Sequence, residues 1–131
     1  MNGNEKVVFA PHLALKNVLA AMEFYKEAFG AIELRRFSND DGSVHVGEMS
    51  IGNAMFHLHE ETIRSGELSP ETLKGTTNVI GIFVPDVHAF VKKAVSAGGT
   101  LSNPVQDYDY GYRQGTVIDP FGHHWLVEQR I

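Results

Sequence analysis

Residues 110–125 read YGYRQGTVIDPFGHHW, and this stretch predicts two strands joined by a tight turn. β-Branched side chains favour a strand over residues 113–118. The Asp-Pro-Phe-Gly sequence at residues 119–122 has the composition of a turn, and residues 123–129 are again apolar around Trp125. The sequence therefore predicts a β-hairpin late in the chain.

The first half of the chain predicts one helix among four strands. Asn17 is a suitable helix N-cap, and apolar residues at helical spacing continue from it to Gly30. Strands are predicted on both sides of this helix, at residues 7–15, 31–37, 43–49 and 54–59. The order of elements is βαβββ, and the charged residues 60–75 then read as a linker with room for a short helix.

The second half repeats the first at a constant offset of 69 residues. The matched pairs are Leu15 and Val84, Val18 and Val87, Met22 and Val91, Gly30 and Gly99, and Gly42 and Gly111. Two βαβββ modules, at residues 5–60 and 76–131, thus form one α+β domain over residues 1–131. Because each module is too small to bury its own sheet face, we expect a curved, eight-stranded mixed sheet with the helices on its convex side.

The hairpin resembles the terminal signature of a known family. Its Gly-x-Arg-x-Gly strand at residues 111–115, followed by Asp-Pro-Phe-Gly-His at 119–123, is similar to the glyoxalase/bleomycin-resistance superfamily, also called vicinal oxygen chelate, in its PhnB-like branch. Paired βαβββ modules around a concave cavity are the architecture of that superfamily. The resemblance also implies a homodimer, with the loop at residues 108–112 and the linker at 60–75 as contact surfaces.

Composition narrows the functional classes. The chain has 131 residues, 43% of them hydrophobic, no cysteine and a formal net charge of −5. The lack of cysteine excludes disulfides, thiolate metal sites and cysteine nucleophiles. Scattered Lys and Arg residues give no basic face for nucleic acid, and no apolar run approaches the ~18 residues of a membrane span. We therefore expect a cytoplasmic protein whose partner is a small molecule.

Alternation along the predicted strands separates a helix-packed face from a cavity face, because successive strand residues point to opposite sides. If residues 52–53 form a two-residue turn, Glu48 lies opposite His57. If the strands on either side of the turn after Asp119 pair in the matching way, Arg113 lies on the same face of the sheet as Glu128. The predicted cavity wall consists of His12, Glu48, His57, His59, Arg113, His124 and Glu128.

Such a wall is polar enough to hold a small anionic or chelating molecule. Tyr110 and Tyr112, in an aromatic loop, are further candidates to cover the ligand. The alternative is that the histidines and acids mark the solvated face of an antiparallel sheet. A sheet that curls on itself favours the cavity, since solvated faces more often carry Lys, Thr and Ser.

The resemblance also implies where a metal would bind. Superfamily members with a metal place one ligand on the first and one on the fourth strand of each module, and these positions are here Ala10, His57, Val79 and Leu126. Only His57 can ligate, and one imidazole does not hold a divalent ion. No metal cofactor is predicted at these positions, which disfavours glyoxalase I and ring-cleaving dioxygenase activities. A displaced set of His12, His59 and Glu128 is the alternative site for a divalent metal.

Two functional hypotheses follow. The first is a protein that sequesters a small molecule without a metal, similar to the bleomycin-resistance members. The second is an enzyme of lyase, isomerase or dioxygenase type that uses Glu48 and His57 as an acid/base pair, because a carboxylate beside an imidazole tunes it and orients one tautomer. Fold does not imply function, and the sequence leaves the specific activity unassigned.

Overall fold

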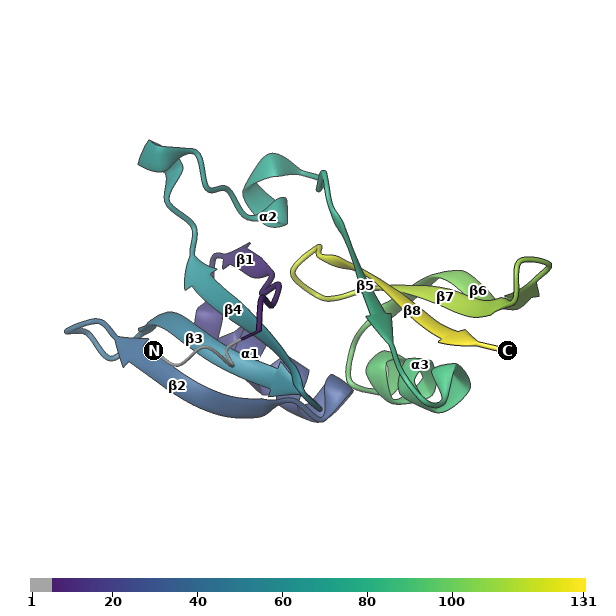
Figure 1. The fold of residues 1–131 in the computed structure, drawn as a ribbon. Coiled ribbons are helices and arrows are strands. Elements are labelled where there is room, and N and C mark those ends of the chain that lie inside the picture. Colours follow the sequence, from purple (N-terminus) through teal and green to yellow (C-terminus); the bar gives the residue numbers. More distant parts are fainter. Residues whose placement is uncertain (1–5) are drawn as a thin grey trace.

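The computed structural model describes residues 6–131, which form two βαβββ modules joined by a linker (Figure 1). The first module contains β1 (His12–Leu15), α1 (Val18–Phe29), β2 (Ile32–Ser38), β3 (Val44–Ile51) and β4 (Ala54–Glu60). The linker holds the 3-10 helix η1 (Ile63–Ser65) and the short helix α2 (Pro70–Leu73). The second module contains β5 (Val79–Phe83), α3 (Val87–Ser96), β6 (Thr100–Tyr108), β7 (Tyr112–Ile118) and β8 (His124–Arg130). The predicted α+β fold and element order are confirmed.

The eight strands form two four-stranded sheets with the same topology. The strand order is β1-β4-β3-β2 in the first sheet and β5-β8-β7-β6 in the second, and the two outer pairs β1/β4 and β5/β8 are parallel. The predicted eight strands are therefore present, but β1 and β5 do not pair with each other. A cavity of about 480 Å³ lies between them and is lined by residues 11–14 and 79–81.

The register confirms the internal repeat. His12 pairs with His57 in the first sheet and Gly81 pairs with Leu126 in the second, an offset of 69 on both strands. The helix N-caps follow the same offset: the side chain of Asn17 accepts from the Ala20 amide, and Asp86 caps α3 in the same way. Each helix therefore begins at the same point of its module.

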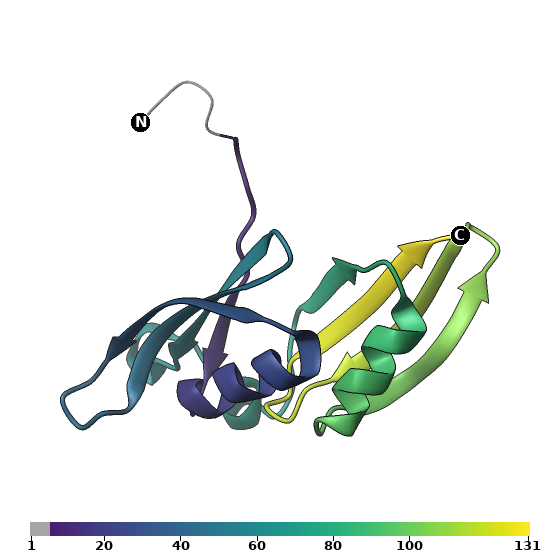
Figure 2. The same cartoon turned by 90° about the horizontal axis from the view of Figure 1, so that it is seen from below.

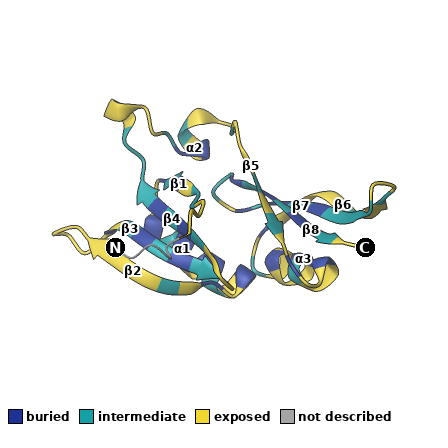
Figure 3. Cartoon of the chain, viewed as in Figure 1, coloured by how far each residue is buried: buried dark blue, intermediate teal, exposed yellow. Residues whose placement is uncertain are grey.

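Both long helices lie on the same side of the sheets. Figure 2 shows α1 between the two sheets and α3 against the second sheet. Buried positions gather where the helices face the strands, whereas β2 is exposed along most of its length (Figure 3). The face of each sheet away from the helices is thus not covered by a helix.

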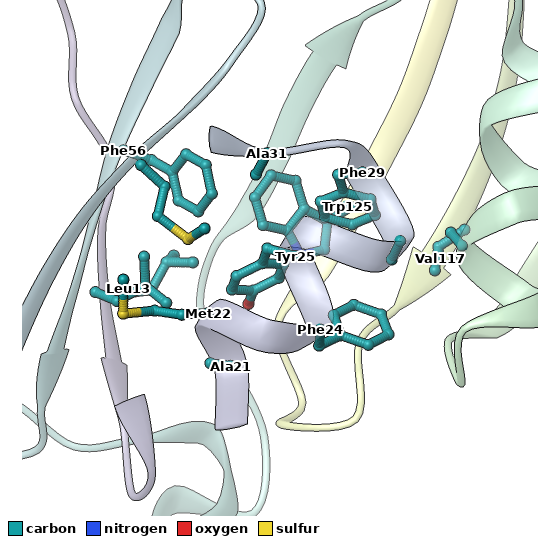
Figure 4. Close-up of a cluster of buried hydrophobic side chains, with 14 of the residues drawn as sticks. Leu13, Ala21, Met22, Phe24, Tyr25, Phe29, Ala31, Phe56, Val117 and Trp125 are labelled. Carbon is teal, nitrogen blue, oxygen red and sulfur yellow. The ribbon is translucent and has the colours of Figure 1, made fainter. Parts of the chain in front are cut away.

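Aromatic residues from both modules form the centre of the core (Figure 4). Tyr25 of α1 packs edge-on against Phe56 of β4 and Trp125 of β8, with ring centroids 5.5 Å apart in both pairs. Tyr25 is fully buried and Trp125 is 2% exposed. Helix α1 therefore belongs to the core of both modules.

The turn that follows β7 is tied to this core by a buried carboxylate. Asp119 accepts hydrogen bonds from the Tyr25 hydroxyl and from Trp125 Nε1, the latter at 2.9 Å. It also accepts from the backbone amides of Phe121 and His123 at 2.9 and 3.0 Å. Burial, together with the negative charge of Asp119, raises the pKa of Tyr25 well above its ordinary value, so this hydroxyl stays a donor. The predicted turn is confirmed, and its aspartate joins the modules.

The first strand is shorter than the sequence pattern predicts. That pattern starts the strand at Val7 and puts Phe9 on the helix-packed face, but β1 begins at His12 and Phe9 is 96% exposed. Pro11 has no N–H to extend the ladder, and only its carbonyl pairs, with the amide of His57. Figure 2 shows residues 6–11, the purple segment just before β1, extending away from the two sheets.

Candidate functional site

Imidazoles from β1 and β4 face a common cavity on the open side of the first sheet. The rings of His12 and His57 stack with centroids 4.4 Å apart and planes 7° apart, and the ring of His59 lies 5.8 Å from that of His12. A cavity of about 290 Å³ adjoins them. We call this cavity the histidine pocket, and its polar lining includes His12, His45, His57, His59, Glu60 and Glu67. Three of the predicted wall residues are thus brought together.

The predicted pairing across the turn at residues 52–53 is also confirmed. Glu48 is the cross-strand partner of His57, and its Oε1 lies 3.5 Å from His57 Nε2. The other oxygen, Oε2, lies 3.4 Å from Nε of Arg35 on β2. The side chains of Glu48 and His57 are 18% and 19% exposed, so this pair is mostly shielded from water while Arg35 reaches solvent.

The surroundings of His12 affect its protonation. Desolvation lowers the pKa of His12 below its ordinary value of 6.5, and the neighbouring His57 and His59 lower it further, with Glu67 acting in the opposite direction. Hydrogen bonds from Thr62 and Ser65 lower the pKa of Glu67, which is therefore a carboxylate at neutral pH. The lowered pKa means that the His12 ring is neutral at neutral pH and takes up a proton less readily than a free imidazole.

Arg113, predicted to face this cavity, lies on the other face of its sheet. The pairing in β7 and β8 joins Arg113 to Gln129, whereas Gln114 is opposite Glu128. Gln129 reaches α3, where its side chain accepts from the Val87 amide at 2.8 Å, so this is the helix-packed face. Arg113 instead pairs with Asp107, with Nε–Oδ1 at 2.6 Å.

The error for Arg113 arises from the length of the turn. The turn between β3 and β4 holds two residues, while β7 and β8 pair up to Ile118 and His124, with residues 119–123 between them. Because the two loops differ in length, the residues of β7 pair with β8 one position away from where the offset of 69 would place them. Because side chains alternate along a strand, a one-residue shift moves every side chain to the other face.

The remaining predicted wall residues lie on the open face of the second sheet. The Glu128 side chain accepts from Gln114 Nε2 at 2.6 Å, and Gln114 in turn accepts from the Tyr110 hydroxyl. Tyr110 packs edge-on against Tyr112, with ring centroids 5.6 Å apart. His124 is on the same face, because side chains alternate along β8 and an even number of residues separates His124 from Glu128. The predicted wall is therefore divided between two sheets and not gathered at one point.

The residues present do not fit a metal centre. Of the four family ligand positions only His57 can coordinate a metal, and within residues 6–131 no group of three or more His, Asp or Glu side chains is arranged to hold an ion. The displaced set is also not assembled, because within the described residues His12, His59 and Glu128 do not come together as a group that could hold an ion.

Several residues near the pockets were not predicted. Arg35 could have been found as the neighbour of Glu48 across the β2–β3 hairpin, but register shifts in β2 obscure that pairing. Gln114 was missed through the same one-residue shift that misplaced Arg113. His45 of β3 is half-exposed, lines the histidine pocket and lies 3.3 Å from Glu60. Glu67 comes from the linker, for which the sequence predicted no position.

Comparison with known proteins identifies the family. The model of the Glyoxalase/Bleomycin resistance protein/Dioxygenase superfamily matches residues 9–127, and the chain belongs to this superfamily. The "Uncharacterized protein Rv0887c" of Mycobacterium tuberculosis is 33% identical over 131 residues, which cover 98% of this chain and 77% of that protein.

Solved structures share the fold. The gene product At5g48480 of Arabidopsis thaliana superposes with a TM-score of 0.71 and 29% identity, covering 94% of this chain and 98% of that one. TioX from Micromonospora sp. ML1 superposes with a TM-score of 0.74 and 21% identity, covering 95% and 97%. Among residues 6–131, none of the helices has the length and apolar character needed to cross a membrane.

Proposed function

We propose that this chain binds a small anionic molecule in the histidine pocket. The observation that carries the proposal is the state of the His12 and His57 rings. Within the described part of the chain, no hydrogen bond to a His12 nitrogen is found, and His57 Nε2 has only the Glu48 carboxylate, 3.5 Å away. His12 is exposed, so its ring nitrogens are open to a ligand that enters the cavity.

The carboxylates of the pocket already have partners, which leaves the imidazoles as the groups that a ligand meets. The carboxylate of Glu67 is already satisfied by the Thr62 and Ser65 hydroxyls, and Glu60 lies against His45. Among the imidazoles of the pocket, His12 is the one for which the described chain supplies no hydrogen-bond partner. An anion that accepts hydrogen bonds from the imidazoles stabilises their protonated forms, so binding takes up protons.

The first test is calorimetry with two probes, inorganic phosphate and oxalate, the latter being a small chelating dianion. We expect the affinity of the bound probe to increase as the pH falls from 8 to 6, with proton uptake seen as a heat that depends on the buffer. His12→Asn and His57→Asn should each weaken binding about tenfold, which corresponds to the loss of one charge-assisted hydrogen bond.

The matched control is His88→Asn on the exposed face of α3. This variant should bind like the wild type. If all three variants bind equally, or if binding does not depend on pH, the histidine pocket is not the anion site and its imidazoles mark a solvated face.

One observation favours a second function, acid/base catalysis in the same pocket. The Glu48 carboxylate lies 3.5 Å from His57 Nε2, which fits a pair that orients one imidazole tautomer. An enzyme would convert a bound compound, whereas a sequestering protein would return it unchanged. Glu48→Gln should abolish turnover and leave binding in place if the pair is catalytic, and mass spectrometry of the recovered compound decides between the two functions.

A further inference from the structure

Glu128 is a buried carboxylate without a cationic partner. It is 8% exposed, and within residues 6–131 no Lys, Arg or His nitrogen lies within 4.0 Å of it. Gln114 donates to one oxygen, Oε1, at 2.6 Å, while no hydrogen bond to the other oxygen is found in the described chain. Oε2 is therefore free to accept a hydrogen bond from a cationic ligand, which would also pair the charge of the carboxylate.

The free oxygen lies over a glycine on the open face of the second sheet. A Cβ atom placed on Gly81 of β5 would lie 2.9 Å from Glu128 Oε2, and no other heavy atom comes within 4 Å of it. Gly81 also borders the 480 Å³ cleft between the two sheets. The missing side chain at Gly81 therefore leaves room for the carboxylate beside an open cavity.

Aromatic rings stand beside the carboxylate. Phe83 is the cross-strand partner of Glu128, and its ring packs edge-on against Tyr112 at a centroid distance of 5.5 Å. Phe83 is 48% exposed, and the Arg130 guanidinium already lies 4.6 Å from its centroid. These rings offer an apolar surface that also attracts positive charge.

We propose that Glu128, Phe83 and Tyr112 form a second binding site, which takes an organic ammonium with its N–H groups toward Glu128 Oε2 and its apolar body against the rings. The net charge of −5 adds a favourable long-range attraction for such a cation. This site is on the other sheet from the histidine pocket and does not depend on the function proposed there.

The test is a titration of the full chain with 2-phenylethylammonium, followed by NMR chemical shifts. Neutral 2-phenylethanol and anionic phenylacetate serve as probes of the same shape. We expect the ammonium to bind at least tenfold more tightly than either, with shifts at β5 and β8. Equal binding of all three probes, or no binding of the ammonium, would overturn the proposal.

Two variants act on the carboxylate in different ways. Glu128→Gln removes the charge and should weaken ammonium binding at least tenfold. Gly81→Ala keeps the charge but displaces the carboxylate; the variant should fold, because the only obstacle is the far end of a flexible side chain. It should weaken binding severalfold. If the ammonium binds Gly81→Ala and wild type equally, the position of Oε2 is irrelevant and the site is wrongly placed.

Three control variants show whether the ammonium binds at Glu128 and the neighbouring rings. Glu71→Gln makes the same chemical change at an exposed position of α2 and should leave binding unchanged. His57→Asn should also leave it unchanged, since the histidine pocket is a separate site. Arg130→Gln removes a competing positive charge from the Phe83 ring and should strengthen ammonium binding; a weaker affinity would show that the ligand is not a cation at these rings.

Discussion

Replacing Asp119 by asparagine should destabilise the domain strongly, because one carboxylate serves donors from three parts of the fold. Asparagine keeps one oxygen for the turn amides but presents an NH₂ group to the Tyr25 hydroxyl and Trp125 Nε1. Both donors are buried, at 0% and 2% exposure. Losing a charged acceptor costs about 1.5–3 kcal/mol per hydrogen bond, so about 3–6 kcal/mol in all. That is a large part of the roughly 5–15 kcal/mol that stabilises a typical domain.

The assay is urea unfolding followed by both circular dichroism and the fluorescence of Trp125, the single tryptophan. Tyr25→Phe removes one donor and should cost less, about 1–2 kcal/mol, and the double variant should be less destabilised than the sum of the two. Asp40→Asn, at an exposed turn, is the matched control and should change little. An Asp119→Asn free energy of unfolding within about 1 kcal/mol of the wild type would refute this account of the core.

Three further predictions concern acid stability, metal and assembly. Hydrogen bonds from Arg36 and Lys26 hold the pKa of Glu33 at about 2, below its ordinary 4.5. The stability that Glu33 contributes is therefore present above pH 4.5 and is lost as the pH falls toward 2. Glu33→Gln should flatten that part of a plot of Tm against pH. Chelator treatment should leave Tm unchanged, and a drop of several degrees restored by Zn²⁺ would reveal metal ligands. We expect a homodimer, because the extended residues 7–9 are at least 70% exposed and apolar; sedimentation as a monomer at tens of micromolar would contradict this.

The sequence predicted the modules well because their signals are local. Helix α1 begins after Asn17 and ends at Gly30, whose φ of 65° is the left-handed conformation that glycine adopts most readily. The hydrophobic alternation of β4 and β8 separated the buried face from the open face correctly, and the two-residue turn placed Glu48 opposite His57. In each case the residues that decide the structure are neighbours in sequence.

Features that depend on loop length or on distant elements could not be predicted in the same way. The face of Arg113 depends on how many residues the turn after Ile118 leaves unpaired, and alternation alone does not give that number. The separation of the predicted wall into two clusters depends on the gap between β1 and β5, which are distant in sequence. Glu67 enters the histidine pocket only because the linker folds back over the first sheet.

The most direct test of the histidine pocket is an NMR titration of the imidazole resonances with inorganic phosphate near pH 6.5. If the pocket binds the anion, the resonances of His12, His57 and His59 move together and saturate, and their pKa values increase in the bound state. The resonance of His88, which lies on α3 in the other module, should stay in place. If no imidazole in the pocket shifts, or if His88 shifts as much as the pocket rings do, the proposed anion site is contradicted.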